Sequence, residues 1–197
     1  MQIITSLEEL RQKAVGYRVV PVAGELFSDV RTPIEVLRIL KNVSSHCFLF
    51  ESVENQEKWG RYTFLGYDPK LEITCTNGLM TVKNGKTEVS EVKHPGEKIK
   101  EILKEYTSPK IKEFPTFTGG LVGYFSYDYI KYSEPKLNLD ANDEEGFKDV
   151  DLMLFDKVIA FDNFSQKIIV IANARTENLR EDYDRCVDEI NKIIELI

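Results

Sequence analysis

The chain has 197 residues, of which 42% are apolar and 30% are charged, with 11 glycines and 7 prolines. This composition is typical of a folded globular chain and excludes a disordered, collagenous or repeat protein. The 33 acidic and 26 basic side chains give a net charge of −7, which argues against nucleic acid as a partner. The sequence contains no apolar run long enough for a membrane span, and residues 1–6 lack the features of a secretory signal.

The cysteines and histidines predict neither metal binding nor disulfide formation. Cys47, Cys75 and Cys186 are far apart and form no CxxC pair, which favours free thiols in a reducing cytoplasm. His46 and His94 do not have the spacing of a helical metal-binding pair. These patterns argue against a metal site and against histidine-centred catalysis.

Local signals define the first helix and strand. The spacing of Ser6 and Glu9 is that of a capping box, so a helix is expected to run to about residue 14. Residues 17–22 are rich in β-branched and aromatic side chains and predict a short strand that Pro21 and Gly24 end.

The next helix and strand lead to the first candidate site. Thr32 and Pro33 supply an N-cap and a first-turn proline, which predicts a helix to about residue 42. Residues 47–50 form an apolar run too short for a helix and predict a strand buried on both faces. This strand delivers Glu51 and Ser52 to its end.

The middle of the chain is rich in turn signals. Residues 61–89 contain two Asn-Gly pairs between β-branched segments and predict an antiparallel meander. Residues 95–106 predict an amphipathic helix that lies across the sheet, and residues 117–125 begin another β segment. The polar, acidic stretch 135–148 is expected to be a surface loop.

The order of elements indicates the fold class. Residues 150–161 and 167–172 predict two strands joined by a turn at residues 162–163. Helices and hairpins in irregular order, without a repeated βαβ unit, indicate an α+β fold. We expect a largely antiparallel sheet, half of an orthogonal β-sandwich architecture, with flanking helices.

The last predicted helix, 176–197, carries an apolar stripe and ends at Ile197 without a capping signal. We interpret residues 1–197 as a single amino-terminal domain of a longer protein. The helix 176–197 is expected to lead into a missing domain and to dock through its apolar stripe.

Taken one at a time, the candidate motifs have ordinary structural interpretations. The Gly-Gly-x-x-Gly at 119–123 lacks the ending of a phosphate-binding loop, so the glycines are expected to allow close backbone packing. The tyrosines of 124–132 are expected to be core or edge residues. Glu51 and Ser52 in isolation indicate a capping or solvated pair, and Arg61 a surface cation.

In combination, four ordered segments resemble the amino-terminal domain of the anthranilate synthase component I family. They are Leu-Phe-Glu-Ser-Val-Glu at 49–54, Trp-Gly-Arg-Tyr-Thr-Phe-Leu-Gly at 59–66, the glycine- and tyrosine-rich segment 117–128, and Asp-Val-Asp-Leu-Met-Leu-Phe-Asp at 149–156. The resemblance covers essentially the whole chain. The related aminodeoxychorismate synthase and isochorismate synthase families share the fold.

The resemblance implies a regulatory role for this chain. A missing chorismate-binding domain would hold Mg²⁺ and convert chorismate to anthranilate and pyruvate, with ammonia from a glutamine amidotransferase subunit. This chain would be inactive alone and would carry part of a tryptophan feedback-inhibition pocket. Glu51 and Ser52 match the positions that contact the inhibitor, and Arg61 matches a basic pocket residue.

These residue types suit a free amino acid. Glu51 can accept the ammonium group, Ser52 can bond either end, and Arg61 can face the carboxylate. Leu49 and Phe50 alternate about their strand, so one of them is expected to line the slot for the indole.

Three alternatives stay open at this point. The chain could belong to aminodeoxychorismate synthase component I, could be a stand-alone amino-acid-binding module, or could be a purely structural domain. The product made by a complete enzyme separates the first from anthranilate synthase, and the sequence beyond residue 197 separates the second.

Overall fold

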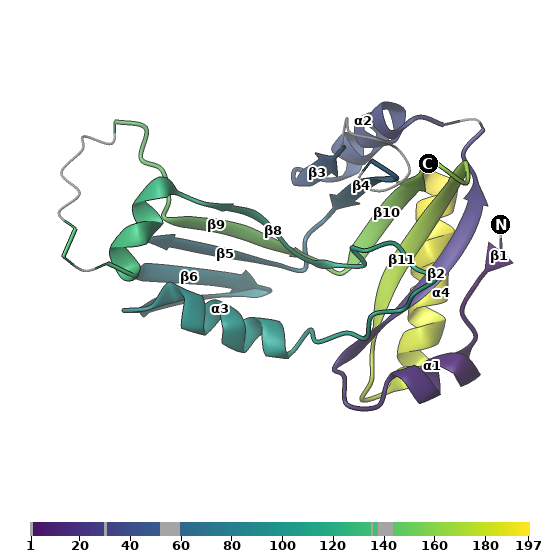
Figure 1. Cartoon of the computed structure of the whole chain (residues 1–197), viewed down its shortest axis with the longest axis horizontal. Helices are drawn as coiled ribbons and strands as arrows, with labels where there is room; N and C mark the ends of the chain where they lie inside the picture. The colour runs from purple at the N-terminus through teal and green to yellow at the C-terminus, as the bar shows by residue number, and fades with distance from the viewer. Residues whose placement is uncertain (1, 30, 52–59, 135, 138–143) are drawn as a thin grey trace. The chain divides into compact units, whose positions relative to one another are not determined.

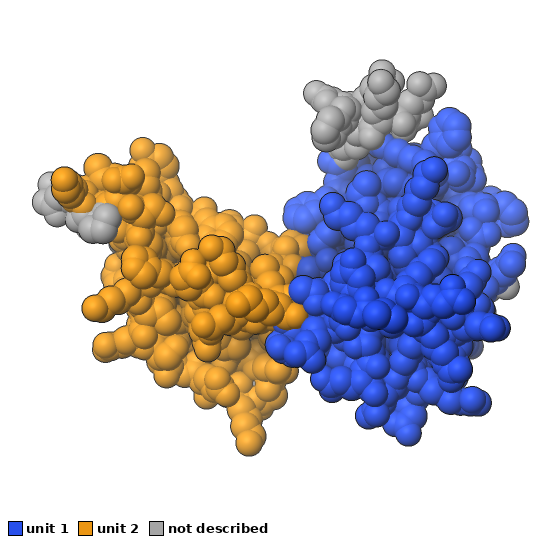
Figure 2. All heavy atoms as spheres, turned by 60° about the horizontal axis from the view of Figure 1, so that its bottom comes forward, with its two compact units in different colours: residues 1–68, 105–120, 155–197 blue, residues 69–104, 121–154 orange. Residues whose placement is uncertain are grey.

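A computed structural model describes residues 2–29, 31–51, 60–134, 136–137 and 144–197 (Figure 1). The chain forms two compact units, which Figure 2 colours separately. Unit 1 comprises residues 1–68, 105–120 and 155–197, and unit 2 comprises residues 69–104 and 121–154. Each unit is built on an antiparallel sheet with helices, so the predicted α+β class is confirmed.

The sheet of unit 1 has six strands among the described residues, in the order β1-β2-β11-β10-β4-β3. Every neighbouring pair is antiparallel. The longest pairing joins β2 to β11, from Val19 opposite Arg175 to Phe27 opposite Lys167. The strands are β1 (Gln2–Ile3), β2 (Val19–Phe27), β3 (Cys47–Phe50), β4 (Tyr62–Tyr67), β10 (Lys157–Asp162) and β11 (Lys167–Arg175).

Strand β2 continues through the two residues that were expected to end it. On one side of β2, Pro21 lies opposite Asn173 of β11. On the other side, β1 pairs only with Gly24 and Glu25, so no strand there needs an N–H from residue 21. A Cβ at Gly24 would lie 2.9 Å from Cγ2 of Ile190. The glycine therefore lets a helix pack closely on the strand.

Helices α1 (Leu7–Lys13), α2 (Pro33–Val43) and α4 (Leu179–Leu196) pack on the sheet of unit 1. The predicted capping box of Ser6 and Glu9 is present, and Thr32, the predicted N-cap, forms a second capping box with Glu35. The shared core contains these buried residues: Leu10, Val20, Val22, Val36, Leu40, Ile168, Val170, Cys186, Ile190 and Ile193.

The apolar stripe of α4 does not serve as a free docking surface. Cys186, Ile190 and Ile193 are fully buried, and the helix lies along β11 and β2 (Figure 1). In this chain the stripe therefore packs on its own sheet, and the docking of this helix on a further domain stays a prediction. The sheet of unit 1 already supplies the apolar surface that covers it.

The sheet of unit 2 has five strands among the described residues, in the order β7-β6-β5-β9-β8. Two tight turns build its meander, with Asn77 and Gly78 at φ +49° and +79° and Gly85 at φ +67°. Its elements are β5 (Leu71–Thr76), β6 (Leu79–Asn84), β7 (Lys86–Glu91), α3 (Pro95–Lys104), β8 (Gly120–Phe125), the short 3₁₀ helix η1 (Tyr127–Tyr132) and β9 (Val150–Phe155).

Two predicted elements divide between the sheets. The meander was expected to begin at residue 61, but β4 pairs with β3 and β10 in the sheet of unit 1. Asp68 adopts φ +50° before Pro69, and this break separates β4 from β5. The apolar run 150–161 also forms two strands, because the strand is interrupted at Asp156. The carbonyl of Asp156 accepts hydrogen bonds from the backbone and side-chain amides of Asn173.

None of the helices formed by the described residues combines the length and the apolar character that crossing a membrane requires.

The glycines of the 119–123 motif serve close packing, as predicted. At Gly119, which has φ +146°, a Cβ would lie 2.7 Å from Nδ2 of Asn173. At Gly123, which has φ +151°, a Cβ would lie 2.0 Å from the backbone oxygen of Asp151. No larger residue fits Gly123 without displacing the neighbouring strand.

Replacing Gly123 with Ala is expected to lower the free energy of unfolding by about 2–4 kcal/mol, because the variant combines backbone strain with a clash against β9. Gly85→Ala is the matched control: its φ is also positive, but open space surrounds the new methyl group, so only about 1 kcal/mol should be lost. Chemical denaturation of both variants measures the difference. Equal losses would contradict the packing role of Gly123.

Candidate ligand-binding site

The pairing of β3 with β4 brings two predicted site residues to one end of the sheet of unit 1. Phe50 lies opposite Phe64, so Glu51 follows β3 at the end where Arg61 precedes β4. Glu51 is exposed. Ser52, the third predicted residue, lies outside the described residues.

The side chains of β3 alternate between two environments. Cys47 and Leu49 pack toward the core beneath the helices, while Phe48 and Phe50 lie on the opposite face. The predicted strand is confirmed, but it is not buried on both faces. It is the edge strand of the sheet, and Phe50 remains 51% exposed.

Phe48 and Phe50 belong to a cluster of rings that the sequence did not predict. The ring centroids of Phe48 and Phe155 are 4.8 Å apart, those of Phe64 and Phe117 are 5.7 Å apart, and both pairs meet edge to face. We call the following residues the aromatic row: Phe48, Phe50, Tyr62, Phe64, Phe117 and Phe155.

A glycine makes room for this row. A Cβ at Gly66 would lie 2.2 Å from the ring of Phe48, which sits directly over the backbone of β4. The glycine of the segment 59–66 is therefore a packing requirement of the aromatic row.

Arg61 is held by Asp162, at the end of β10. Its Nε donates to Oδ1 at 3.0 Å and its Nη2 donates to Oδ2 at 2.6 Å, in the paired geometry that strengthens an ion pair. Asp162 is only 3% exposed, and its Oδ1 also accepts the backbone N–H groups of Phe164 and Ser165. The guanidinium lies 4.9 Å from the ring centroid of Tyr62, the residue that begins β4.

The environment of Asp162 favours its ionised form. Burial by itself disfavours the charge, but the hydrogen bonds from Arg61 and from Ser165 outweigh it and hold the pKa of Asp162 below its usual value. The positive charge of Arg61 is thus already balanced within unit 1. Its Nη1 group makes none of the hydrogen bonds to Asp162 and can donate to a further partner.

Sequence reasoning missed Asp162 and assigned it to a turn. The turn is present, and its side chain organises it by accepting the N–H groups of residues two and three positions later. The Asp-x-x-Ser pattern after a β-branched run is a signal for such a turn. The sequence contains no signal for its pairing with Arg61, 101 residues earlier.

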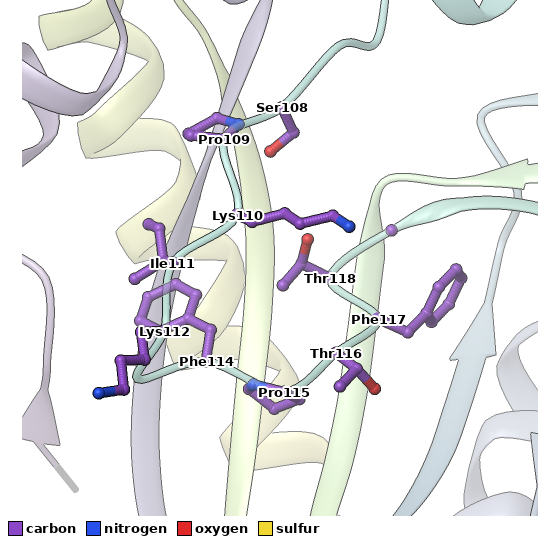
Figure 3. Close-up of a pocket in the computed structure, with 11 residues that line it drawn as sticks. Ser108, Pro109, Lys110, Ile111, Lys112, Phe114, Pro115, Thr116, Phe117 and Thr118 are labelled. Atoms are coloured by element: carbon purple, nitrogen blue, oxygen red, sulfur yellow. The ribbon is translucent and has the colours of Figure 1, made fainter.

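A hollow of about 390 Å³ lies in the loop 108–119 of unit 1 (Figure 3). Phe117 of the aromatic row forms part of its lining. Sequence reasoning did not predict this hollow, because its lining residues have no motif spacing.

Asp149, from the last of the resembling segments, is the centre of a polar network in unit 2. The carboxylate of Asp149 accepts hydrogen bonds from Lys131 Nζ at 2.7 Å, Tyr132 Oη at 2.7 Å and the backbone N–H of Asn77 at 2.6 Å. The hydroxyl of Tyr132 also accepts the N–H of Gly78. These residues hold the β5–β6 turn against η1, which gives them a structural role.

Within the described ranges, no three side chains of His, Cys, Asp or Glu come together in a way that could hold a metal ion. Among the residues that the structure describes we therefore assign no place to the Mg²⁺ that the resemblance implies for a complete enzyme.

Comparison with known proteins gives consistent matches. A family model described as "chorismate binding enzyme" matches residues 45–195. Anthranilate synthase component 1 of Acinetobacter calcoaceticus is 35% identical, over 98% of this chain and 40% of that protein. The protein of the same name from Aquifex aeolicus is 34% identical over the same shares of the two chains. Anthranilate synthase alpha subunit 2, chloroplastic, of Arabidopsis thaliana is 38% identical over 86% of this chain and 29% of that protein.

Among solved structures, anthranilate synthase component I from Streptococcus pneumoniae matches with a TM-score of 0.49 and 26% identity, over 84% of this chain and 36% of that chain. The chain therefore spans about two fifths of the length of the curated relatives it matches.

Replacing Arg61 with Ala is expected to shift the acid-induced loss of stability to higher pH. In the wild-type protein the lowered pKa of Asp162 stabilises the fold above the unfolded-state pKa, and this contribution disappears as pH falls through the folded-state pKa. Without the guanidinium, fewer hydrogen bonds offset the burial of Asp162, so the folded-state pKa of Asp162 rises. The loss of stability then begins at a higher pH as the solution is acidified. Urea denaturation between about pH 2 and pH 7 measures this shift.

Arg18→Ala is the control for this experiment. Arg18 pairs with Glu105 and Glu177 through side chains that are all more than half exposed, so its removal should leave the acid limb unchanged. The same displacement in both variants would show that general charge, and not the Arg61–Asp162 pair, sets the acid response.

Proposed function

Because the chain belongs to the chorismate binding enzyme family, we propose that it is the amino-terminal regulatory part of an anthranilate synthase component I. The matched relatives that carry this name, at 34–35% identity over almost the whole chain, support the proposal. The complete protein would convert chorismate to anthranilate and pyruvate in tryptophan biosynthesis. This chain contributes regulation and is inactive by itself.

The proposed ligand of this chain is tryptophan, as a feedback inhibitor. The observation that carries this assignment is the shared strand end, where Glu51 follows β3, Arg61 precedes β4 and Phe50 remains half exposed. Glu51 would accept the ammonium group, and Arg61 would donate from Nη1 to the carboxylate while Asp162 fixes its position. Phe50, and not the core-facing Leu49, is the strand residue available to the indole.

Ser52 completes the proposed site next to Glu51 in the sequence. Its hydroxyl can donate to the carboxylate or accept from the ammonium group. We assign it to inhibitor binding and assign no residue of this chain to catalysis.

Regulation follows if tryptophan also contacts the chorismate-binding domain. A ligand shifts a conformational equilibrium only by binding one arrangement better than another. A site completed by two domains has this property, since it is whole in only one of their arrangements.

The remaining partners belong to the complete enzyme. A glutamine amidotransferase subunit would supply ammonia, and the chorismate-binding domain would hold Mg²⁺. Free Cys47, Cys75 and Cys186 favour a cytoplasmic location, where thiols stay reduced. The aromatic amine obtained from the complete enzyme tests the assignment. If its product, after treatment with a lyase, is an aminobenzoate with the amine para to the carboxylate, the enzyme is an aminodeoxychorismate synthase instead.

In the complete enzyme, Ser52→Leu is expected to abolish inhibition by tryptophan while chorismate turnover stays within about twofold of wild type. The leucine removes a hydrogen-bonding group and fills space at the proposed inhibitor site, which corresponds to a loss of about 2–4 kcal/mol in tryptophan binding. Steady-state rates with and without tryptophan measure both effects. Equal loss of turnover and inhibition would place Ser52 in the active site.

The 197-residue chain alone is expected to bind tryptophan with a Kd of about 1 mM or weaker. Complete burial of an indole side chain of roughly 150–250 Å² contributes about 4–6 kcal/mol, and a partial site contributes less. Association itself costs about 4–15 kcal/mol, so little binding energy remains. Calorimetry on the chain checks this, and micromolar affinity would mean that the site is self-contained and needs no second domain.

A further inference from the structure

Unit 2 contains two Asn-Gly pairs that are alike in the sequence but differ in their surroundings. Asn77 and Gly78 form the turn between β5 and β6. Asn84 and Gly85 lie at the turn between β6 and β7. In such a pair the backbone nitrogen of the glycine lies close to the side-chain amide of the asparagine, and no Cβ on the glycine hinders their approach. Each pair is therefore a candidate site of deamidation, a reaction of the chain with itself and with water.

Deamidation begins when the glycine nitrogen attacks the side-chain amide carbon, Cγ, of the asparagine. The lone pair of the nitrogen forms the N–Cγ bond, and the electrons of the Cγ–Nδ2 bond leave with the amide nitrogen. The proton of the glycine N–H passes through solvent to this leaving group, which departs as ammonia. Water then opens the resulting succinimide ring at one of its two carbonyl carbons and leaves aspartate or isoaspartate. The asparagine is thus replaced by a negatively charged residue.

The Asn84–Gly85 pair can reach the geometry of this attack. Both residues are exposed, and neither the Asn84 side chain nor the Gly85 N–H forms a hydrogen bond with a described residue. Gly85 is the residue between the two strand ends, where Asn84 lies opposite Lys86. A Cβ on Gly85 would meet no atom within 4 Å. Rotation of the amide toward the glycine nitrogen therefore meets little steric resistance.

The strand that follows this turn adds little restraint. Among the described residues β7 is an edge strand, and each of its residues is exposed. A hairpin end at an exposed sheet edge opens locally at a low cost in free energy. The positive charge of Lys86, the next residue in the chain, also favours loss of the proton from the Gly85 nitrogen.

The Asn77–Gly78 pair is held at each of its reacting groups. The N–H of Gly78 donates to the hydroxyl of Tyr132 at 2.7 Å, and the amide oxygen of Asn77 accepts a hydrogen bond from Lys131 Nζ at 2.8 Å. The backbone N–H of Asn77 donates to the carboxylate of Asp149 at 2.6 Å. The glycine nitrogen must lose its hydrogen bond before it attacks, and the nearby carboxylate disfavours the negative charge that it develops.

One contact of Asn77 acts in the opposite direction. The Lys131 ammonium polarises the amide carbonyl, which by itself favours attack on the amide carbon. The same contact fixes the amide, however, and the carbonyl of Gly78 accepts the N–H of Val92 at 2.7 Å, which fixes the glycine. Because attack requires the amide and the glycine nitrogen to move toward each other, we expect this restraint to outweigh the polarisation.

We propose that Asn84 is a site of spontaneous deamidation and that the hydrogen bonds around the β5–β6 turn protect Asn77. The sequence alone does not distinguish the two pairs, whereas the folded chain does. The product places a carboxylate at residue 84, and its isoaspartate form adds a methylene group to the backbone of the β6–β7 turn. The proposal concerns unit 2 alone and does not depend on the proposed tryptophan site.

Timed incubation of the 197-residue chain in mildly alkaline buffer tests the proposal. Cleavage after Glu72 and Glu88 releases residues 73–88, which contain both pairs. Fragmentation of this peptide in a mass spectrometer then shows which asparagine has gained the mass of the acid. In the folded protein Asn84 is expected to react at least about tenfold faster than Asn77, since only Asn77 must first lose hydrogen bonds.

The same chain unfolded in urea is the control. No folded structure restrains either pair there, so the two asparagines are expected to react at similar rates. Similar rates in the folded chain, or faster reaction of Asn77, would overturn the proposal, because the hydrogen bonds would then give no protection. An intact Asn84 in the folded chain, with reaction in urea, would mean that the β6–β7 turn excludes the reactive geometry.

Tyr132→Phe tests the protection of Asn77. The variant removes the hydroxyl that accepts the Gly78 N–H, so Asn77 is expected to react about fivefold faster while Asn84 keeps its wild-type rate. Tyr129→Phe is the matched control on the same short helix, since the Tyr129 hydroxyl forms no hydrogen bond with a described residue, and should change neither rate. Circular dichroism establishes that both variants are folded. An unchanged rate at Asn77 in folded Tyr132→Phe would contradict the protective role of the hydroxyl.

Gly85→Ala tests the reaction at Asn84 and leaves the hydrogen bonds of the other turn in place. The methyl group shields the attacking nitrogen and disfavours the positive φ of residue 85, so reaction at Asn84 is expected to slow about tenfold while the rate at Asn77 is unchanged. An unchanged rate at Asn84 would mean that its amide is not lost through attack by the Gly85 nitrogen, and the proposal would fail.

Discussion

The pairing of β2 with β11 is the interaction on which unit 1 depends. The pairing joins residues 19–27 to residues 167–175, so two segments near opposite ends of the chain must come together before the pairing can form. One face of this pair receives α4 through Ile190 and Ile193, and the other is covered by Phe114 of the loop 108–119. β10 then pairs with β11, and β4 with β10, which carries Arg61 to Asp162. The candidate site at this strand end is therefore positioned by contacts that are far from it in the sequence.

The pairing of β4 with β10 explains why Arg61 has a fixed position at the end of this sheet. Arg61 alone would be a flexible cation, but a buried carboxylate that also organises a turn holds its guanidinium. The ion pair fixes the orientation of the Arg61 guanidinium, but it also reduces the net charge of the site, since Asp162 neutralises the group that would face a ligand carboxylate. Binding of the proposed ligand would then depend on the direction of the remaining N–H donors more than on long-range attraction.

Residues that stand out in the sequence serve the scaffold in several cases. Gly66 and Gly123 allow an aromatic ring and a neighbouring strand to approach the backbone. Tyr132 and Asp149, which belong to different segments of the chain, close one hydrogen-bond network around the β5–β6 turn. These residues serve the fold, and a fold by itself does not specify the chemistry of its site.

Local physical chemistry allowed the sequence by itself to determine much of the secondary structure. The capping box at Ser6, the N-cap at Thr32 and the turns at Asn77 and Asn84 depend on neighbours within a few residues, and all of them form as predicted. The α+β class follows from the order of these elements. The sequence also placed Glu51 and Arg61 beside strand ends, because the strands themselves have clear patterns.

Only the tertiary structure decided how strands divide between two sheets, that α4 is covered by its own unit, that Asp162 holds Arg61 and that the loop 108–119 encloses a hollow. The sequence of an apolar strand or helix face does not specify which surface it packs on, since burial against any apolar surface is favourable. The partner is chosen by which arrangement buries all faces and pairs all strands at once. That choice is a property of the whole chain, and no local pattern contains it.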